Sequence, residues 1–241
     1  MFLTDADSLP SSTERQRDNT RFTRLLDLTP EFQLVTLDSD KRREAENYIQ
    51  ARFRAAYCAY IHEFHDELLT MHCAGELSAI AGISKAVHQQ LFLEQYTELP
   101  VEKELAQIKR YEVDRHSIVE IGNLVATTNG SSLAFFVVLA SVLSGAGYKY
   151  MVFTATEKLR SQLSRLGFKT DYICQANPQR LHLSSDQWGS YYDSKPEVVT
   201  GSIEEAMHLI AGKRLPSCIQ RILASRISLL GQQLQLNLSG V

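Results

Sequence analysis

Two polar side chains interrupt the apolar run Ile118–Ala126, and they are the first residues of the sequence that could do chemistry. Glu120 is a carboxylate inside a strand-like segment, where partial removal from water would raise its pKa toward a value useful for a general base. Pairing with a cation such as Arg115 explains the same residue equally well. Asn123 needs a hydrogen-bond partner in such surroundings, which makes it a candidate for binding a substrate or a carrier.

Basic residues form a second group of candidates. Arg52 and Arg54 lie late in a predicted helix beside its aromatic stripe, where they could bind a phosphate or a carboxylate. A solvated helix flank is the alternative for both. Three histidines lie near Asp66 in the sequence: His62, His65 and His72. Of these, His62 and His65 fall on one face of the predicted helix. No matching block of ligands follows, so we expect no metal site.

Composition narrows the classes of function. The chain has 241 residues, of which 44% are hydrophobic and 22% charged, enough for one sizeable core. Its 25 basic and 28 acidic residues give a formal net charge of -3, without a long run of one sign. That balance argues against a nucleic-acid binder and gives no attraction to anionic lipid.

No segment of the sequence predicts export or membrane insertion. The first residues lack a basic region followed by an apolar stretch. The apolar run at 133–143 is shorter than the ~20 residues that span a bilayer. The four cysteines are scattered without a CxxC pair, as is typical of reduced thiols. We therefore expect a cytoplasmic protein with no transmembrane segment.

The elements that must position these candidates follow from periodicity. Residues 32–37 alternate as a first strand, and apolar residues recur every three or four positions from Ala45 to Phe64, which predicts one long helix. Strand-like runs at 68–73 and 77–83 flank a glycine-containing turn and predict a hairpin. Pro100 opens a helix that extends to Arg110.

The clearest pattern begins at Ile118–Ala126. This strand leads through a polar turn at 127–131 into a helix at 132–144 and a second strand at 150–154. Thr154 and Glu157 fit a capping box for a further helix, which Gly167 ends. The order predicts a βαβ crossover with parallel strands. Beyond it, the sequence predicts strands at 172–174 and 197–202 and helices at 203–212 and 216–230.

Several blocks of sequence carry a resemblance to a known family. They are RFRAAY at 52–57, LFLEQY at 91–96, VEIGNL at 119–124, VFTAT at 152–156 and WGSYYD at 188–193. Their order resembles the thermostable hemolysin family. The run 132–168, with the strand and turn before it, also resembles the second half of a GNAT acyltransferase domain. Glu120 resembles the glutamate of the E-S-R-F block in acyl-homoserine-lactone synthases, although the residues after it differ, so lactone formation is not implied.

The resemblance implies an α/β fold of the GNAT type, with a mixed central sheet flanked by helices. It divides the chain into an N-terminal arm at 1–30, an acyltransferase domain at 31–202 and a C-terminal helical extension at 203–241. It also implies transfer of an acyl group from an acyl-CoA or acyl-carrier-protein thioester to a small amine, with Glu120 as the base.

The same resemblance implies the remaining site residues. The turn that binds the cofactor's pyrophosphate in GNAT proteins aligns with residues 127–132, which gives five candidates: Thr127, Asn129, Gly130, Ser131 and Ser132. The tyrosine that many GNAT enzymes use as an acid is replaced by Leu163. Tyr191, Tyr192 or Cys174 could serve instead, and Trp188 is a candidate for binding substrate.

Two alternatives to an acyltransferase stay open. One is a cytolysin acting on membranes, as the family name states, and the other is a GNAT-like fold that binds without catalysis. Acyl carrier protein is a candidate partner, and no nucleic acid is expected. The C-terminal helix is a candidate contact for a homo-oligomer, because its apolar stripe must be buried: Ile219, Ile222, Leu223, Ile227 and Leu230.

Overall fold

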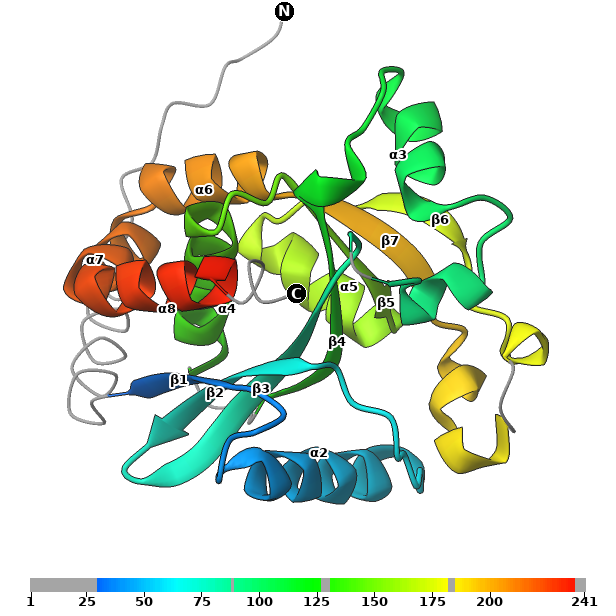
Figure 1. Ribbon diagram of the computed structural model, residues 1–241, viewed down its shortest axis with the longest axis horizontal. Coiled ribbons are helices and arrows are strands. Elements are labelled where there is room, and N and C mark those ends of the chain that lie inside the picture. The colour runs from blue at the N-terminus through cyan, green and yellow to red at the C-terminus, as the bar shows by residue number, and fades with distance from the viewer. Residues whose placement is uncertain (1–29, 88, 127–130, 182–184, 237–241) are drawn as a thin grey trace, which may run out of the picture.

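A seven-stranded mixed sheet forms the centre of the protein (Figure 1). The computed structural model describes residues 30–87, 89–126, 131–181 and 185–236. In spatial order the strands are β1 (Glu31–Val35), β2 (Glu67–Cys73), β3 (Glu76–Lys85), β4 (Ile118–Ala126), β5 (Tyr150–Ala155), β7 (Glu197–Ser202) and β6 (Asp171–Gln175). Neighbouring strands are antiparallel except for β4 and β5, which are parallel as predicted.

The parallel pair is short, and this shapes the site. Residues 118–121 of β4 pair with residues 150–153 of β5. Beyond Ile121, β4 continues to Ala126 alongside β3, and β5 continues alongside β7. The two strands therefore separate after Ile121 and Phe153, which opens the sheet near its middle.

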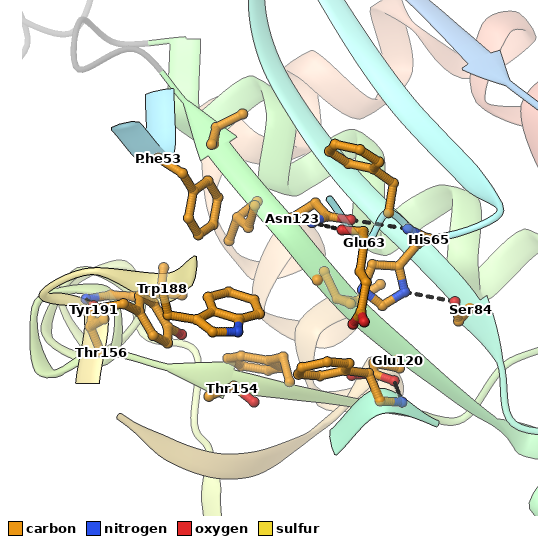
Figure 2. Close-up of a pocket in the computed structure, with 18 of the residues that line it drawn as sticks. Phe53, Glu63, His65, Ser84, Glu120, Asn123, Thr154, Thr156, Trp188 and Tyr191 are labelled. Carbon is orange, nitrogen blue, oxygen red and sulfur yellow. Dashed lines mark hydrogen bonds between the residues drawn. The ribbon is translucent and has the colours of Figure 1, made fainter. Parts of the chain in front are cut away.

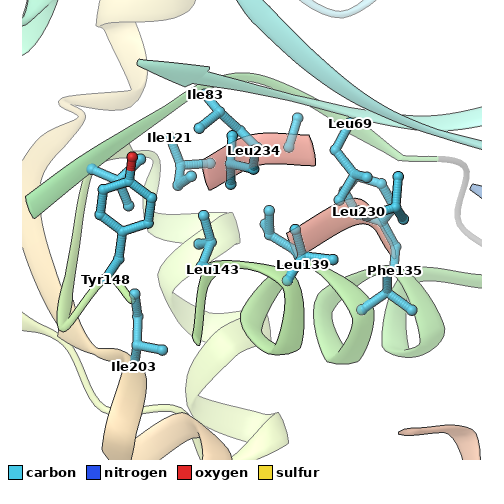
Figure 3. Packing of buried hydrophobic residues seen from close by; sticks show 14 of the residues in the cluster. Leu69, Ile83, Ile121, Phe135, Leu139, Leu143, Tyr148, Ile203, Leu230 and Leu234 are labelled. Carbon is cyan, nitrogen blue, oxygen red and sulfur yellow. The ribbon is translucent and has the colours of Figure 1, made fainter. Parts of the chain in front are cut away.

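Helices cover both faces of the sheet (Figure 1). They are α2 (Arg42–Tyr57), α3 (Val101–Lys109), α4 (Ser131–Gly145), α5 (Glu157–Leu166), α6 (Ile203–Gly212), α7 (Arg214–Ile222) and α8 (Ala224–Leu236). The α/β fold class predicted from the sequence, a mixed central sheet flanked by helices, is confirmed. The main core lies between the sheet and α4, where Leu69 and Ile121 meet Leu139 and Leu230 (Figure 3). Because α6, α7 and α8 also pack on α4, that helix is apolar all round.

The opposite face of the sheet packs against α2. Ile49 and Phe53 of that helix lie against Leu68 and Ile80 of the sheet. The long helix predicted from 45 to 64 is wrong beyond residue 57, because α2 ends at Tyr57 and Cys58 adopts a left-handed conformation with φ 54°. Residues 58–66 instead form an extended loop, so the two histidines of this segment do not share a helical face.

Two further boundaries differ from the sequence prediction. Thr156, rather than Thr154, caps α5 by accepting a hydrogen bond from the Leu159 amide at 3.3 Å. The helix predicted at 216–230 is divided at Leu223 into α7 and α8. α8 packs on α4 at Gly231, where an added Cβ would make an ordinary van der Waals contact with the Val142 carbonyl oxygen at 3.4 Å.

Candidate active site

A cavity of about 990 Å³ opens on the α2 side of the sheet, over the point where β4 and β5 separate (Figure 2). Its walls come from α2, from the loop after α2, from β4 and β5, and from the aromatic segment 188–192. A short 3-10 helix, η1 (Phe92–Gln95), closes one end. Segments far apart in the sequence therefore meet around one space.

Glu120 lies in the floor of this cavity, with only 3% of its surface exposed. Its carboxylate accepts hydrogen bonds from the amides of Phe92 at 2.8 Å and Leu93 at 3.1 Å, at the start of η1. Burial raises the pKa of Glu120 to about 8, the two amides oppose that rise, and the nearby Glu94 carboxylate adds to it. A carboxyl group with such a pKa can act as a base near neutral pH.

The alternative partner for Glu120 is engaged elsewhere. Arg115 forms a bidentate pair with Glu94, with distances of 2.7 and 2.8 Å, and a further ion pair with Glu102 at 2.5 Å. This pairing helps to hold the pKa of Glu94 below its ordinary value. No ion pair within the described part of the chain includes Glu120. The salt bridge to Arg115 considered from the sequence is therefore absent from the described structure.

His65 faces the same cavity, and its loop is held in place from two sides. Arg42 of α2 donates to the carbonyl oxygens of His65 at 2.7 Å and Asp66 at 2.9 Å. Asn123 of β4 accepts from the His65 amide at 3.0 Å and donates to the Glu63 carbonyl at 3.3 Å. Asn123 thus meets its need for partners within the protein while still lining the cavity.

The imidazole of His65 rests on the sheet by its Cδ2–Nε2 edge, where two glycines leave it room. A Cβ at Gly82 would lie 2.6 Å from the ring, and a Cβ at Gly122 would lie 1.9 Å from Nε2. The Nδ1 atom is 2.6 Å from the Ser84 hydroxyl (Figure 2). Burial, with a smaller contribution from Arg42, lowers the pKa of His65 to about 4, so the ring is neutral at neutral pH. Periodicity placed His65 on a helix, so no feature of the sequence indicated this contact.

An aromatic wall completes the cavity. Trp188 lies 6.3 Å from Phe53 and 5.5 Å from Tyr191 between ring centroids, and Tyr57 lies 5.2 Å from Tyr191. The indole Nε1 of Trp188 is buried and has no hydrogen-bond partner among the described residues. Burial raises the pKa of Tyr191, and it raises that of Tyr192 to about 12, so both phenols are protonated at neutral pH.

A second cavity of about 470 Å³ lies on the α4 side of the sheet, lined mostly by apolar side chains of α4, α5 and α6. The two cavities have common walls at the separation of β4 and β5, formed by Ile121, Leu124, Phe136 and Phe153. The two cavities therefore lie next to each other where β4 and β5 separate.

The structure brings together only part of the predicted site. Arg52 and Ser132 line the main cavity, whereas Arg54 does not and instead places its guanidinium 4.2 Å from the Tyr60 ring centroid. Cys174 lies on β6 outside the cavity, its thiol donates to the Tyr96 carbonyl at 3.5 Å, and burial raises its pKa to about 11. The remaining candidates are in the turn before α4: Thr127, Asn129 and Gly130 lie outside the described residues, and Ser131 begins the helix.

Comparison with known proteins agrees with the resemblance read from the sequence. The chain matches the model of the thermostable hemolysin family over residues 35–207 and belongs to that family. No match is found among curated proteins.

Solved structures with a similar shape include two synthases of acylated products. One is the acyl-homoserine-lactone synthase LasI, at 11% identity and a TM-score of 0.49, with 72% of this chain and 90% of that chain covered. Another is the N-acyl amino acid synthase FeeM from uncultured soil microbes, at 14% identity and a TM-score of 0.47, with the same coverage of 72% and 90%. N-acetylglutamate synthase from Neisseria gonorrhoeae, complexed with coenzyme A, matches at 11% identity and a TM-score of 0.39, covering 72% of this chain and 35% of that chain.

Proposed function

We propose that the protein is an N-acyltransferase that moves an acyl group from a CoA or acyl-carrier-protein thioester to a small amine. The observation that carries this proposal is the position of Glu120. It is a buried carboxyl group with a pKa of about 8, and it lines the main cavity near the point where β4 and β5 separate and where the two cavities share lining residues.

The proposed reaction needs one base and one proton path. The amine nitrogen attacks the thioester carbonyl carbon, a C–N bond forms, and the C–S bond breaks to give an amide and a thiol. The Glu120 carboxylate takes one proton from the amine, directly or through a water molecule, and that proton then returns to the leaving sulfur. No oxidant, reductant or metal is required by this balance.

The two cavities supply separate places for the two ends of the donor. The main cavity reaches Ala126 and Ser132, which flank the turn proposed to bind pyrophosphate at the start of α4. The second cavity, at about 470 Å³, has room for an acyl chain much longer than acetyl. The thioester carbonyl would then lie at the opening between β4 and β5, close to Glu120.

The aromatic wall and Arg52 are the proposed acceptor side of the cavity. Trp188 and Tyr191 offer flat apolar surfaces, and the unpartnered Nε1–H of Trp188 is a donor in need of an acceptor. Tyr191 and Tyr192 both line the cavity and are protonated at neutral pH, so either phenol could relay the proton from Glu120 to the leaving sulfur. Cys174 has no part in this proposal because it lies outside the cavity.

Binding and turnover test the proposal separately. Calorimetric titration with a long-chain acyl-CoA and with an acyl-carrier protein should give heat with at least one donor. Thiol release in the presence of a mixture of amino acids and small amines should follow, with the amide product identified by mass spectrometry. Gly130→Val should abolish donor binding while leaving the melting temperature nearly unchanged. Wild-type protein that neither binds nor consumes either donor would overturn the acyltransferase proposal.

A further inference from the structure

The block LFLEQY has no part in the reaction described above, although it closes one end of the main cavity. It contains η1, and the amides at the start of η1 all donate to carboxylates. The Leu91 amide donates to Glu94 Oε2 at 2.8 Å. The Phe92 and Leu93 amides donate to Glu120 at 2.8 and 3.1 Å. Amides in the first turn of a helix have no backbone partner, and here two acidic side chains supply one.

The two bonds to Glu120 orient its carboxylate. Oε2 accepts from Phe92 and Oε1 accepts from Leu93, so each oxygen takes one backbone amide. An ionised carboxyl group has about four lone-pair positions, which leaves one on each oxygen for an amine or a water molecule. The direction of these free positions depends on where the backbone of η1 lies.

Glu94 determines the position of that backbone. Its Oε1 atom accepts from the Val101 amide at 2.8 Å and from Arg115 Nη1 at 2.7 Å. Its Oε2 atom accepts from the Leu91 amide and from Arg115 Nη2, each at 2.8 Å. One buried carboxylate therefore joins the start of η1, the start of α3 and Arg115.

Arg115 connects this junction to the strand that carries Glu120. It belongs to η2 (Arg115–Ser117), which leads directly into β4. Its guanidinium also donates to the carbonyl oxygens of Ala86 at 2.7 Å and Gln89 at 3.1 Å, in the segment before η1. The pair of Glu94 with Arg115 thus holds η1 and the segment before it at a set place beside the beginning of β4.

Apolar packing already attaches η1 to the same place. Leu91 and Leu93 are buried in one cluster with Ile118, the first residue of β4. The side chains of Glu94 and Arg115 are 5% and 25% exposed, and the cost of removing such charges from water offsets most of their attraction. The ion pair therefore adds accuracy of position more than stability.

Glu94 also places a fixed negative charge beside Glu120. Burial would raise the pKa of Glu94, but the hydrogen bonds from Arg115 and from two backbone amides outweigh burial and lower it. Glu94 is therefore ionised at neutral pH. A like charge disfavours ionisation of its neighbour, and Glu94 contributes in this way to the raised pKa of Glu120, after the larger contribution of burial.

We propose that Glu94 is a positioning residue for Glu120: through its pair with Arg115 it fixes η1, whose two amides orient the Glu120 carboxylate toward the acceptor amine. Its charge also makes Glu120 the stronger base. Glu94 lies outside the residues that line the cavity, so it acts through η1 and not on the substrate. This role rests on the acyltransferase function proposed above, and it gives the LFLEQY block a part in that reaction.

Three variants separate charge, position and stability. Glu94→Gln keeps the size of the side chain and an oxygen for the amides, but it removes the charge. The midpoint of the rise of kcat/KM with pH should fall by about 0.5–1 pH unit, and kcat should fall about 10-fold with little change in KM. Glu94→Asp keeps the charge but shortens the side chain, so kcat should fall while the midpoint stays. Glu102→Gln is the matched control, because Glu102 pairs with Arg115 at 2.5 Å without contacting η1, and neither quantity should change.

Nuclear magnetic resonance tests the same relationship without an activity assay. In protein labelled with ¹³C at the glutamate carboxyl groups, the Glu120 resonance is identified by its loss in Glu120→Gln. It should titrate near pH 8 in the wild type, at lower pH in Glu94→Gln and unchanged in Glu102→Gln. The amide protons of Phe92 and Leu93 should shift with the same midpoint in the wild type. This last measurement needs no variant, so it decides even if Glu94→Gln fails to fold.

The outcomes distinguish the role of Glu94 from the function on which it rests. An active wild type, with Glu94→Gln matching Glu102→Gln in both kcat and midpoint, overturns the role of Glu94 and leaves the acyltransferase proposal standing. Amide protons of Phe92 and Leu93 that do not follow the Glu120 titration do the same. An inactive wild type whose Glu120 titration still shifts in Glu94→Gln overturns the acyltransferase proposal and retains the coupling of Glu94 to Glu120. An inactive wild type without that shift overturns both.

Discussion

The imidazole of His65 occupies the space that any side chain at Gly122 would need. A Cβ at this position would lie 1.9 Å from Nε2 and 2.8 Å from Cδ2 of the ring. These two residues are 57 positions apart in the sequence and come from a loop and a strand, yet the ring lies where a side chain at position 122 would begin. The lack of a side chain at Gly122 thus lets the Nε2 edge of the ring rest on β4.

Gly122→Ala should consequently displace His65. We expect the melting temperature to fall, corresponding to about 1–3 kcal/mol of overpacking, and turnover to fall with it. Gly145→Ala is the matched control, because a Cβ at the end of α4 meets nothing within 4 Å. Thermal melts and thiol-release rates of the two variants check this. If the two variants had the same melting temperature and the same rate, the contact between His65 and Gly122 would contribute neither to stability nor to turnover.

Glu120→Gln should lower turnover by about 10²-fold or more while leaving the fold intact. The amide retains an oxygen that can accept from the Phe92 or Leu93 backbone, so the start of η1 keeps one of its two hydrogen bonds. Rates measured beside melting temperatures test this combination. A variant that loses several degrees of stability but keeps wild-type turnover would assign Glu120 a structural role.

The pH dependence of the wild type should report the raised pKa of Glu120. Since only the carboxylate can accept a proton, kcat/KM should rise with pH and level off above about 8, and the rise should be absent in Glu120→Gln. A pH–rate profile from 5.5 to 9.5 with saturating donor checks this. A rate that is independent of pH in that range would exclude Glu120 as the base.

The free energy of unfolding should fall as the pH rises, whereas kcat/KM should increase. The folded-state pKa of about 8 lies above the ordinary value of 4.5, so the folded protein holds this proton more tightly than the unfolded chain. The corresponding stabilisation is complete below pH 4.5 and is lost as the pH rises through 8. The melting temperature of Glu120→Gln should therefore improve relative to the wild type between pH 5 and pH 9, which differential scanning calorimetry can measure.

The C-terminal helices should contribute to folding rather than to membrane lysis. No helix among the described residues is long and apolar enough to cross a bilayer. Leu230 of α8 is fully buried against α4, whereas Leu229 beside it is 43% exposed. Leu230→Ala should cost about 2–5 kcal/mol of stability, and Leu229→Ala about 0.5 kcal/mol or less.

Vesicle experiments complete that prediction. Purified protein, incubated alone with zwitterionic or anionic vesicles, should neither sediment with them nor release a trapped dye. Dye release at sub-micromolar concentration that is lost on deletion of residues 224–241 would favour the cytolysin alternative. Size-exclusion chromatography of Ile222→Ser tests the expected oligomer contact, because Ile222 is a large apolar residue of α7 with 52% of its surface exposed.

Local patterns in the sequence determined most elements of the fold. The strands at Ile118–Ala126 and Glu197–Ser202 and the helix at Ile203–Gly212 have the bounds that the sequence predicts. Each is specified by contacts with near neighbours, by alternation or helical periodicity, and by residues that end it. The parallel pairing of β4 and β5 was also predictable from the sequence. A strand, a helix and a second strand in close succession usually form a βαβ crossover, in which the two strands are parallel. Glu120 was recognisable because a carboxylate in an apolar strand conflicts with its surroundings.

The tertiary structure alone decided where α2 ends and what lies beyond it. Apolar residues continue at helical spacing to Phe64, but Ala59 and Ile61 are buried in an extended loop that Arg42 and Asn123 hold in place. The position of His65 depends on such long-range contacts, on two glycines in different strands and on a serine opposite Glu120. None of these contacts produces a periodic pattern in the sequence, because each joins residues that are far apart along the chain. The proposed base, Glu120, could be recognised from its own strand, whereas the place of His65 in the cavity was visible only in the folded chain.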